Sequence, residues 1–193
     1  MGKIRLIAFD PSLLNLGVSV GVLGIDGVLV VEHVETLHPD RLVDKYNISP
    51  DWDADVNMQR AVMLEFIVDN YLSGWNPDVM VIELPIFNGN PKTLQTQMKA
   101  IVTLERAAIR HSSKLKTNIV ELMPNVIKAG VGVDVKVSGS DKTAITRALN
   151  TLVGDGKIRY INPDHLPNAM DDHANDSVAM LYTQCVEMLD GFS

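Results

Sequence analysis

Three short segments of the sequence carry acidic side chains in positions suited to metal chemistry. Asp10 closes an apolar run at residues 4–9, and Glu83 interrupts another at residues 79–84, just before Pro85. A charged group inside a buried strand must be paired or bind a metal, because unpaired burial is very costly. Two carboxylates at neighbouring strand ends repel each other unless a cation lies between them. Asp10 and Glu83 are therefore candidate metal ligands.

The third segment, residues 171–176, reads DDHAND and opens a run with helical periodicity. In a helix, Asp172 and Asp176 are four residues apart and His173 and Asp176 are three apart, so their side chains share one face. The helix macrodipole accounts for acids in the first turn, but it accounts less well for Asp176, which lies a turn further in. Carboxylates with one imidazole suit Mg²⁺ or Mn²⁺ better than a structural zinc. The three segments together predict a divalent-metal site.

Clustered carboxylates of this kind hold two divalent ions about 4 Å apart around a scissile phosphate. One ion lowers the pKa of a water so that it becomes a nucleophile, and the other stabilises the leaving 3′ oxygen. His173 could ligate the second ion or assist proton transfer, and Lys128 or Lys142 could neutralise charge on the transition state. We therefore expect Mg²⁺, with Mn²⁺ able to substitute, and two ions per active site.

The opening of the chain predicts three strands. Residues 4–9, 17–23 and 28–34 are apolar runs with β-branched side chains, and the turn sequence Gly-Ile-Asp-Gly separates the last two. The short connections between these runs predict an antiparallel meander. Residues 38–56 are polar, with two prolines and several aspartates, and they predict a long loop.

One helix connects this meander to the strand that carries Glu83. Five apolar positions at helical spacing predict a helix over residues 57–72, namely Met58, Ala61, Val62, Phe66 and Tyr71. Residues 78–84 are a near-continuous apolar run, of the kind that forms a strand buried on both faces. A right-handed crossover lays this strand parallel to the first one, so that Asp10 and Glu83 lie side by side.

The second half of the chain alternates helices and strands. The pattern predicts a strand at residues 118–123, a short extended piece at residues 158–161, and helices over residues 92–112, 142–153 and 171–189. The chain therefore has an α/β pattern. Its 193 residues fit one compact domain, which we place at residues 1–193.

Composition excludes several classes of protein. Hydrophobic residues make up 46% of the chain and charged residues 21%, which is globular composition rather than disorder. The longest apolar runs are too short to span a membrane, and the first residues show no signal-peptide pattern. The single cysteine, Cys185, cannot form an internal disulfide and fits a reducing compartment. We expect a cytoplasmic protein without membrane association.

The net charge of −7 hides a strong asymmetry along the chain. Residues 84–150 carry ten Lys or Arg against four Asp or Glu, whereas both flanking regions are acidic. A basic middle region suits a protein that concentrates cations on one surface. Phosphate contacts with a nucleic-acid backbone are the role we expect for Lys92, Lys99, Arg106 and Arg110.

The acidic segments, taken in order, resemble the motifs of RuvC-like Holliday junction resolvases. IAFDPSLLNLGVSV at residues 7–20 is similar to the family's first-strand motif, and VMVIELPIF at residues 79–87 to its strand ending in the second catalytic acid. DDHANDSVAML at residues 171–181 resembles the closing motif. Gln97-Met98-Lys99-Ala100 resembles the family's Gln-Ala-Arg-Gly segment, and residues 124–142 resemble the stretch that holds two active-site or DNA-binding lysines.

This resemblance covers nearly the whole chain and implies a ribonuclease H-like fold with a five-stranded mixed sheet flanked by helices. It implies metal-dependent hydrolysis of four-way DNA junctions, with catalytic roles for Asp10, Glu83, His173 and Asp176. Asp172 is a further candidate metal ligand. The sequence leaves two alternatives for the closer ligand of the ions, Asp172 and His173. DNA contacts are expected from Phe87, Lys92, Gln97 and Lys99, although Phe87 stands one residue later after Glu83 than the family's stacking aromatic.

The approximate two-fold symmetry of a junction, with paired nicks on opposed strands, predicts a homodimer. The helix over residues 92–112 is the candidate interface, with Met98, Ile101 and Leu104 as possible excess hydrophobic side chains. The brevity and divergence of the chain suit a bacteriophage version. The expected location is then the bacterial cytoplasm, or the host cytoplasm if the protein is phage-encoded.

Three alternatives compete with a junction resolvase. Another ribonuclease H-like nuclease, acting on flaps, RNA–DNA hybrids or structured RNA, would use the same metal site. An actin-like kinase or ATPase also ends its first strand in an acid, but it needs a duplicated domain that 193 residues cannot supply. A DNA-binding module without catalysis would not keep clustered acids, because bare carboxylates repel DNA unless they hold metal.

Overall fold

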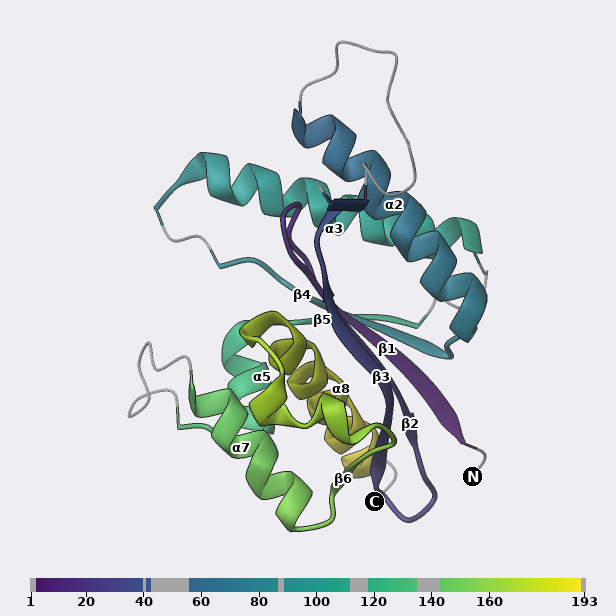
Figure 1. Ribbon diagram of the computed structural model, residues 1–193, viewed down its shortest axis with the longest axis vertical. Coiled ribbons are helices and arrows are strands. Elements are labelled where there is room, and N and C mark those ends of the chain that lie inside the picture. The colour runs from purple at the N-terminus through teal and green to yellow at the C-terminus, as the bar shows by residue number, and fades with distance from the viewer. Residues whose placement is uncertain are drawn as a thin grey trace.

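A six-stranded mixed sheet with helices on both faces makes up the structure (Figure 1). The computed structural model describes residues 3–39, 41–42, 56–86, 89–111, 118–134 and 143–191. The strand order across the sheet is β5-β4-β1-β2-β3-β6. No helix in these parts of the chain is both long and apolar enough to span a membrane.

The antiparallel meander predicted from the apolar runs is confirmed. It consists of β1 (Ile4–Asp10), β2 (Leu16–Leu23) and β3 (Leu29–Leu37). The strand β4 (Val79–Glu83) lies parallel to β1, as the right-handed crossover requires, and Phe9 pairs with Ile82 in this register. The ends of β1 and β4 therefore bring Asp10 and Glu83 to one edge of the sheet.

Two short strands complete the sheet at its edges. The strand β5 (Ile119–Leu122) lies parallel to β4, and β6 (Ile158–Tyr160) lies parallel to β3. The sheet thus has six strands and not the five expected. The piece that becomes β6 is three residues long, and its partner lies far away in the sequence, so a local pattern does not identify it as a strand.

The helices form one layer on each face of the sheet (Figure 1). One layer holds α2 (Val56–Trp75) and α3 (Pro91–His111). The other holds α5 (Pro124–Gly130), α7 (Thr143–Gly154) and α8 (Asp172–Asp190), which follows two short 3₁₀ helices, η1 (Pro163–His165) and η2 (Pro167–Ala169). Burial of an apolar core on both faces explains why residues 6–9 of β1 and 79–82 of β4 are continuously apolar.

The buried face of α2 differs from the expected one. Met58, Val62 and Phe66 are exposed, whereas the core side of the helix consists of Met63, Leu64, Ile67, Val68 and Leu72. Apolar side chains occur around much of this helix, so more than one face fits a helical spacing. Packing against α3 and the sheet decides which face is buried. Of the predicted loop at residues 38–56, the structure describes residues 38–39, 41–42 and 56, and residue 56 begins α2.

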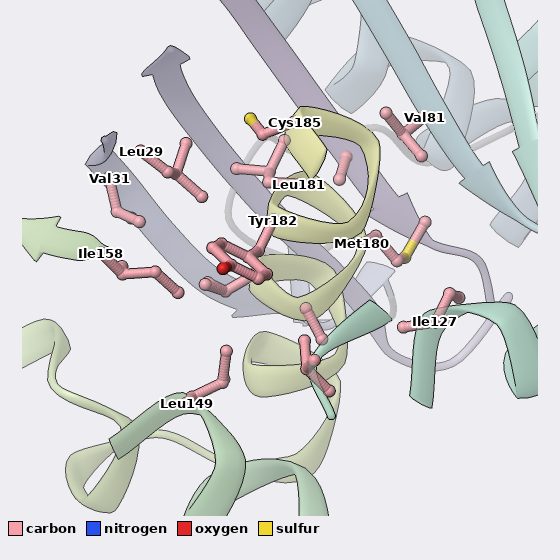
Figure 2. Close-up of a cluster of buried hydrophobic side chains, with 14 of the residues drawn as sticks. Leu29, Val31, Val81, Ile127, Leu149, Ile158, Met180, Leu181, Tyr182 and Cys185 are labelled. Atoms are coloured by element: carbon pink, nitrogen blue, oxygen red, sulfur yellow. The ribbon is translucent and has the colours of Figure 1, made fainter. Parts of the chain in front are cut away.

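The last helix, α8, is the central element of its layer. It packs across β1, β2 and β3, and its residues from Ala174 to Cys185 are buried apart from Asp176. Figure 2 shows Leu181, Tyr182 and Cys185 of α8 among side chains from β3, β6 and α7. Burial on nearly all sides fixes the position of α8, and hence of the acids in its first turn.

Two glycines allow close approach to α8. A Cβ at Gly17, at the start of β2, would collide with the backbone carbonyl of His173 and would lie 3.2 Å from the Cβ of Asp10. A Cβ at Gly130, the last residue of α5, would collide with the side chain of Thr183. The Thr183 hydroxyl instead contacts the carbonyl oxygen of Ile127 at 3.2 Å. These contacts hold α8 against β2 and α5.

Substitution of Gly17 by alanine should therefore destabilise the protein. Because the added Cβ meets backbone atoms of His173, which cannot rotate away, we expect Gly17→Ala to lower the free energy of unfolding by about 1–3 kcal/mol. Gly74→Ala is the matched control, because nothing lies within 4 Å of a Cβ there and the site is within a helix. It should be neutral or stabilising by up to about 1 kcal/mol. Urea unfolding measures both, and equal stability of the two variants would contradict the close approach.

Candidate active site

The ends of β1 and β4 and the first turn of α8 meet at one edge of the sheet. Asp10 ends β1 and is 8% exposed, and Glu83 ends the neighbouring β4. The carboxyl groups of Asp10 and Glu83 are hydrogen bonded to each other. From α8, the Nδ1 atom of His173 lies 2.6 Å from Oδ2 of Asp10. Asp10 is thus the centre of the cluster and contacts both neighbours.

Burial and mutual repulsion change the protonation of the acids. Burial, followed by the charge and hydrogen bond of Asp10 and the charge of Asp176, raises the pKa of Glu83 far above its usual range, against a lowering by Lys128. Burial and the charge of Asp10 likewise raise the pKa of Asp176 to about 7, although His173 and Lys128 lower it. Glu83 therefore holds a proton at neutral pH when no cation is bound.

His173 is held from both sides of its ring. The hydrogen bond to Asp10 raises the pKa of the His173 imidazole, and burial opposes this rise. On the other side, Nδ2 of Asn15 lies 3.4 Å from Nε2 of His173. The Oδ1 atom of Asn15 in turn lies 2.8 Å from Nδ1 of His38. This chain of side chains orients the imidazole toward Asp10.

Neither Asn15 nor His38 was identified from the sequence. Asn15 lies in the short connection between β1 and β2, inside the segment that resembles the first-strand motif, so its position was a usable signal. His38 follows β3 and carries no pattern of its own. Only the pairing of β2 with β3 brings the two side chains together, as the Leu16–Leu37 register places them at the same edge.

The neighbouring acids on α8 have different surroundings. Asp171 caps the helix, since its Oδ1 accepts from the backbone N–H of Ala174 at 3.0 Å and from the hydroxyl of Thr36 on β3. Asp172 is exposed and acts on the cluster through its charge, which raises the pKa of Asp176. Of the two candidates, His173 contacts Asp10 directly.

The donor set fits a hard divalent cation. Three carboxylates and an imidazole, which are ligands of Mg²⁺ and Mn²⁺, lie at one end of the sheet, and the pKa values of Glu83 and Asp176 are raised. As placed, no three His, Cys, Asp or Glu side chains converge on a single ion position among the residues described. Asp10 instead contacts both Glu83 and His173. A cation would take the place of the proton that Glu83 holds.

The structure places one of the two candidate lysines beside the acids. Lys128, on α5, is near enough to lower the pKa values of both Glu83 and Asp176. Lys142 lies outside the described residues, and so does Phe87. Lys128 is thus a positive charge at the edge where Asp10, Glu83 and Asp176 gather, in a position to attract an anionic group.

A cleft of about 260 Å³ opens beside Asp10 and Glu83. Gln97 of α3 lines this cleft, whereas Lys92 and Lys99 are exposed on the same helix and are not among its lining residues. Arg110, near the end of α3, forms ion pairs with Glu65 and Asp69 of α2. Arg110 thus differs from Lys92 and Lys99, because these ion pairs already compensate its charge within the protein.

No protein-family model matches the chain, and no curated protein sequence matches it. Among solved structures, RuvC of Thermus thermophilus in complex with a Holliday junction substrate matches with a TM-score of 0.68 at 14% identity, over 97% of this chain and 96% of that chain. The yeast mitochondrial Holliday junction resolvase Ydc2 matches with a TM-score of 0.67 at 13% identity, over 98% of this chain and 82% of that chain. The chain therefore has the ribonuclease H-like fold, in the form found in RuvC.

The raised pKa of Glu83 predicts a pH-dependent stability of the metal-free protein. Since the unfolded chain releases this proton near pH 4.5 and the folded chain holds it to much higher pH, the free energy of unfolding falls as pH rises through this window. In EDTA, the fall in melting temperature between about pH 6 and pH 8 should be at least about 3 °C larger for the wild type than for Glu83→Gln.

Thermal unfolding in EDTA measures this difference. Glu187→Gln, which removes an exposed carboxyl from α8, is the control and should keep the wild-type dependence on pH. The contribution of Asp176 has the same sign and is present in all three proteins. If the melting temperatures of the wild type and Glu83→Gln change with pH in parallel, the pKa of the Glu83 carboxyl is not raised in the folded protein.

Proposed function

We propose that this chain is a structure-selective endodeoxyribonuclease that resolves four-way DNA junctions by divalent-metal-dependent hydrolysis, with paired nicks and a single nuclease domain. The observation that carries this proposal is the cluster of Asp10, Glu83 and Asp176 at the carboxyl edge of the sheet. It occurs on a fold shared with two proteins described as junction resolvases or bound to a junction. The bacterial or host cytoplasm is the proposed location.

The side chains of the cluster have distinct parts in this proposal. Asp10, Glu83 and Asp176, with His173 or Asp172, hold Mg²⁺ or Mn²⁺, and two such ions supply positive charge and Lewis acidity at the scissile phosphate. His173 is oriented by Asp10 and Asn15, so its ring is positioned to ligate or to move a proton.

The proposed cationic groups act on the phosphate. Lys128, which already lowers the pKa values of the acids, reduces negative charge where the phosphate would arrive. Lys142 is proposed for the same role. Binding along the backbone falls to Lys92 and Lys99, both exposed on α3, with Gln97 in the cleft and Phe87 stacking on an exposed base.

We also propose a homodimer, in which two active sites are related by the two-fold symmetry of a junction. The interface side chains expected on α3 need correction. Ile101 is 2% exposed and Leu104 is fully buried, because both belong to the apolar core that α3 forms with α2 and the sheet. Met98 remains exposed, together with Val102 and Ile109 on the same helix. These three side chains are the proposed contact surface of α3.

Removal of single carboxylates tests the catalytic proposal. Asp10→Asn, Glu83→Gln and Asp176→Asn should each reduce junction cleavage to below about a tenth of the wild-type rate at saturating Mg²⁺, since each removes a charged metal ligand. Binding of the junction should stay intact or become tighter, because it depends on the basic residues of α3. Asp155→Asn, in an exposed turn after α7, is the control and should cleave as the wild type does.

The same assay compares a four-way junction with duplex DNA, a flap, an RNA–DNA hybrid and a structured RNA. Preferred cleavage of the junction supports the proposed substrate. Preferred cleavage of any other substrate assigns the chain to another ribonuclease H-like activity. A carboxylate variant that keeps more than a tenth of the rate removes that residue from the set of metal ligands.

Sedimentation velocity tests the dimer. Val102→Asp places a charge on the proposed contact surface and should weaken dimerisation at least about tenfold, without loss of folding, because Val102 is 45% exposed. Ile25→Asp, in the turn between β2 and β3 at the far end of the sheet, is the control and should remain dimeric. A wild-type chain that is monomeric both free and on junction DNA would contradict the homodimer.

A further inference from the structure

The first turn of α8 carries two of the proposed metal ligands, His173 and Asp176, and it lies at an exposed end of the helix. Asp171 and Asp172, which begin this turn, are both exposed. Helix ends fray, whereas the side chains of a metal site must keep their positions to within about 0.5 Å. The turn therefore needs anchors besides its own helical hydrogen bonds.

Asn175 lies between these two ligands in the sequence and is only 2% exposed. Its Nδ2 atom lies 3.1 Å from the carbonyl oxygen of Pro167 and 3.2 Å from the hydroxyl oxygen of Thr146. Both hydrogens of the amide therefore have an acceptor. The carbonyl oxygen of Met170 lies further away, at 3.5 Å.

The contacts of Asn175 join the start of α8 to two neighbouring elements. Pro167 is the first residue of η2, in the segment that leads into α8, and Thr146 is in the first turn of α7. Asp171 bonds the same turn to β3 through the hydroxyl of Thr36. The turn that carries the proposed ligands is thus bonded to β3, η2 and α7.

The donor atoms of Asn175 account for a polar side chain at this buried position. Burial of an amide is costly where its groups lack hydrogen bonds, and the Oδ1 atom of Asn175 has no partner among the residues described. An apolar side chain would avoid that cost, but it would not bond α8 to η2 and α7. Gln184 is also buried, further along α8, yet its amide makes no hydrogen bond to a residue that the structure describes.

We propose that Asn175 is a positioning residue of the metal site, which keeps His173 and Asp176 in place by bonding the first turn of α8 to η2 and α7. This inference rests on the proposed metal-dependent function. Because Asn175 is buried, it acts through these two side chains and not on the ions or the DNA. In other metal sites, loss of a residue that supports the ligands typically costs about 10–100-fold in metal affinity or activity.

Binding of Mn²⁺ to the full chain without DNA, measured by isothermal titration calorimetry, tests the proposal apart from catalysis. Asn175→Ala should weaken Mn²⁺ binding about tenfold or more. Thr146→Val removes one acceptor and keeps the contact with Pro167, so it should weaken binding less, by about threefold. Gln184→Ala truncates a buried amide on the same helix and is the matched control, which should bind Mn²⁺ as the wild type does.

The Mg²⁺ dependence of junction cleavage separates positioning from a loss of folded protein. In Asn175→Ala, the Mg²⁺ concentration for half-maximal cleavage should rise by about tenfold or more. A merely structural role would instead lower the rate in proportion to the folded fraction, with an unchanged Mg²⁺ dependence. Circular dichroism at the assay temperature measures that fraction for each variant.

The possible failures are distinguishable. Wild-type affinity for Mn²⁺ in Asn175→Ala, or an equal loss of affinity in Gln184→Ala, overturns the positioning role and leaves the nuclease function standing. If Asn175→Ala does not fold, Thr146→Val decides, and an unchanged affinity for Mn²⁺ in that variant overturns the proposal. A wild-type chain that neither binds Mn²⁺ nor cleaves any nucleic acid in Mg²⁺ contradicts the proposed function itself.

Discussion

The repulsion among three partly buried carboxylates is the constraint on which the site depends. Asp10, Glu83 and Asp176 come from β1, β4 and α8. The charge of Asp10 raises the pKa values of both Glu83 and Asp176, and the charge of Asp176 raises that of Glu83. Such a cluster opposes folding in the absence of a cation, because burial disfavours the charged form of every member. The rest of the fold must therefore hold these strand ends and the helix together against that repulsion.

The position of α8 supplies most of this restraint. Its buried residues contact β1, β2 and β3, and its packing among Leu29, Val31, Leu149 and Ile158 is visible in Figure 2. Gly17 lets the first turn of the helix approach the end of β1, and Asp171 and Thr36 join that turn to β3. The hydrophobic core thus stabilises an arrangement of strand ends and helix that repulsion between the clustered carboxylates would otherwise push apart.

On the other face, α3 combines two tasks on one helix. Its buried side, with residues such as Ile101 and Leu104, belongs to the core shared with α2 and the sheet, and its remaining surface carries Gln97, Lys92 and Lys99. A helix anchored in this way holds its polar side chains at a constant distance from the acids at the sheet edge. Binding groups on a rigid element are positioned more accurately than groups on a loop.

Much of this architecture was predictable from the sequence. Strands and helices follow from local residue patterns, and the order of neighbouring parallel strands follows from the right-handed twist of the chain. Apolar runs located β1 to β4, and the right-handed crossover placed β4 beside β1, so the sequence by itself determined that Asp10 and Glu83 are neighbours. Helical spacing placed His173 and Asp176 on one turn of α8.

Only the tertiary structure decided several other features. It buried Ile101 and Leu104, exposed Met58, Val62 and Phe66, and paired β6 with β3, because a period identifies a helix or strand but not the neighbour that covers it. It also joined His38 and Asn15 to His173, and it placed the ring of His173 against Asp10. These contacts join residues far apart in the chain, so their geometry exists only once the sheet and both helix layers have formed.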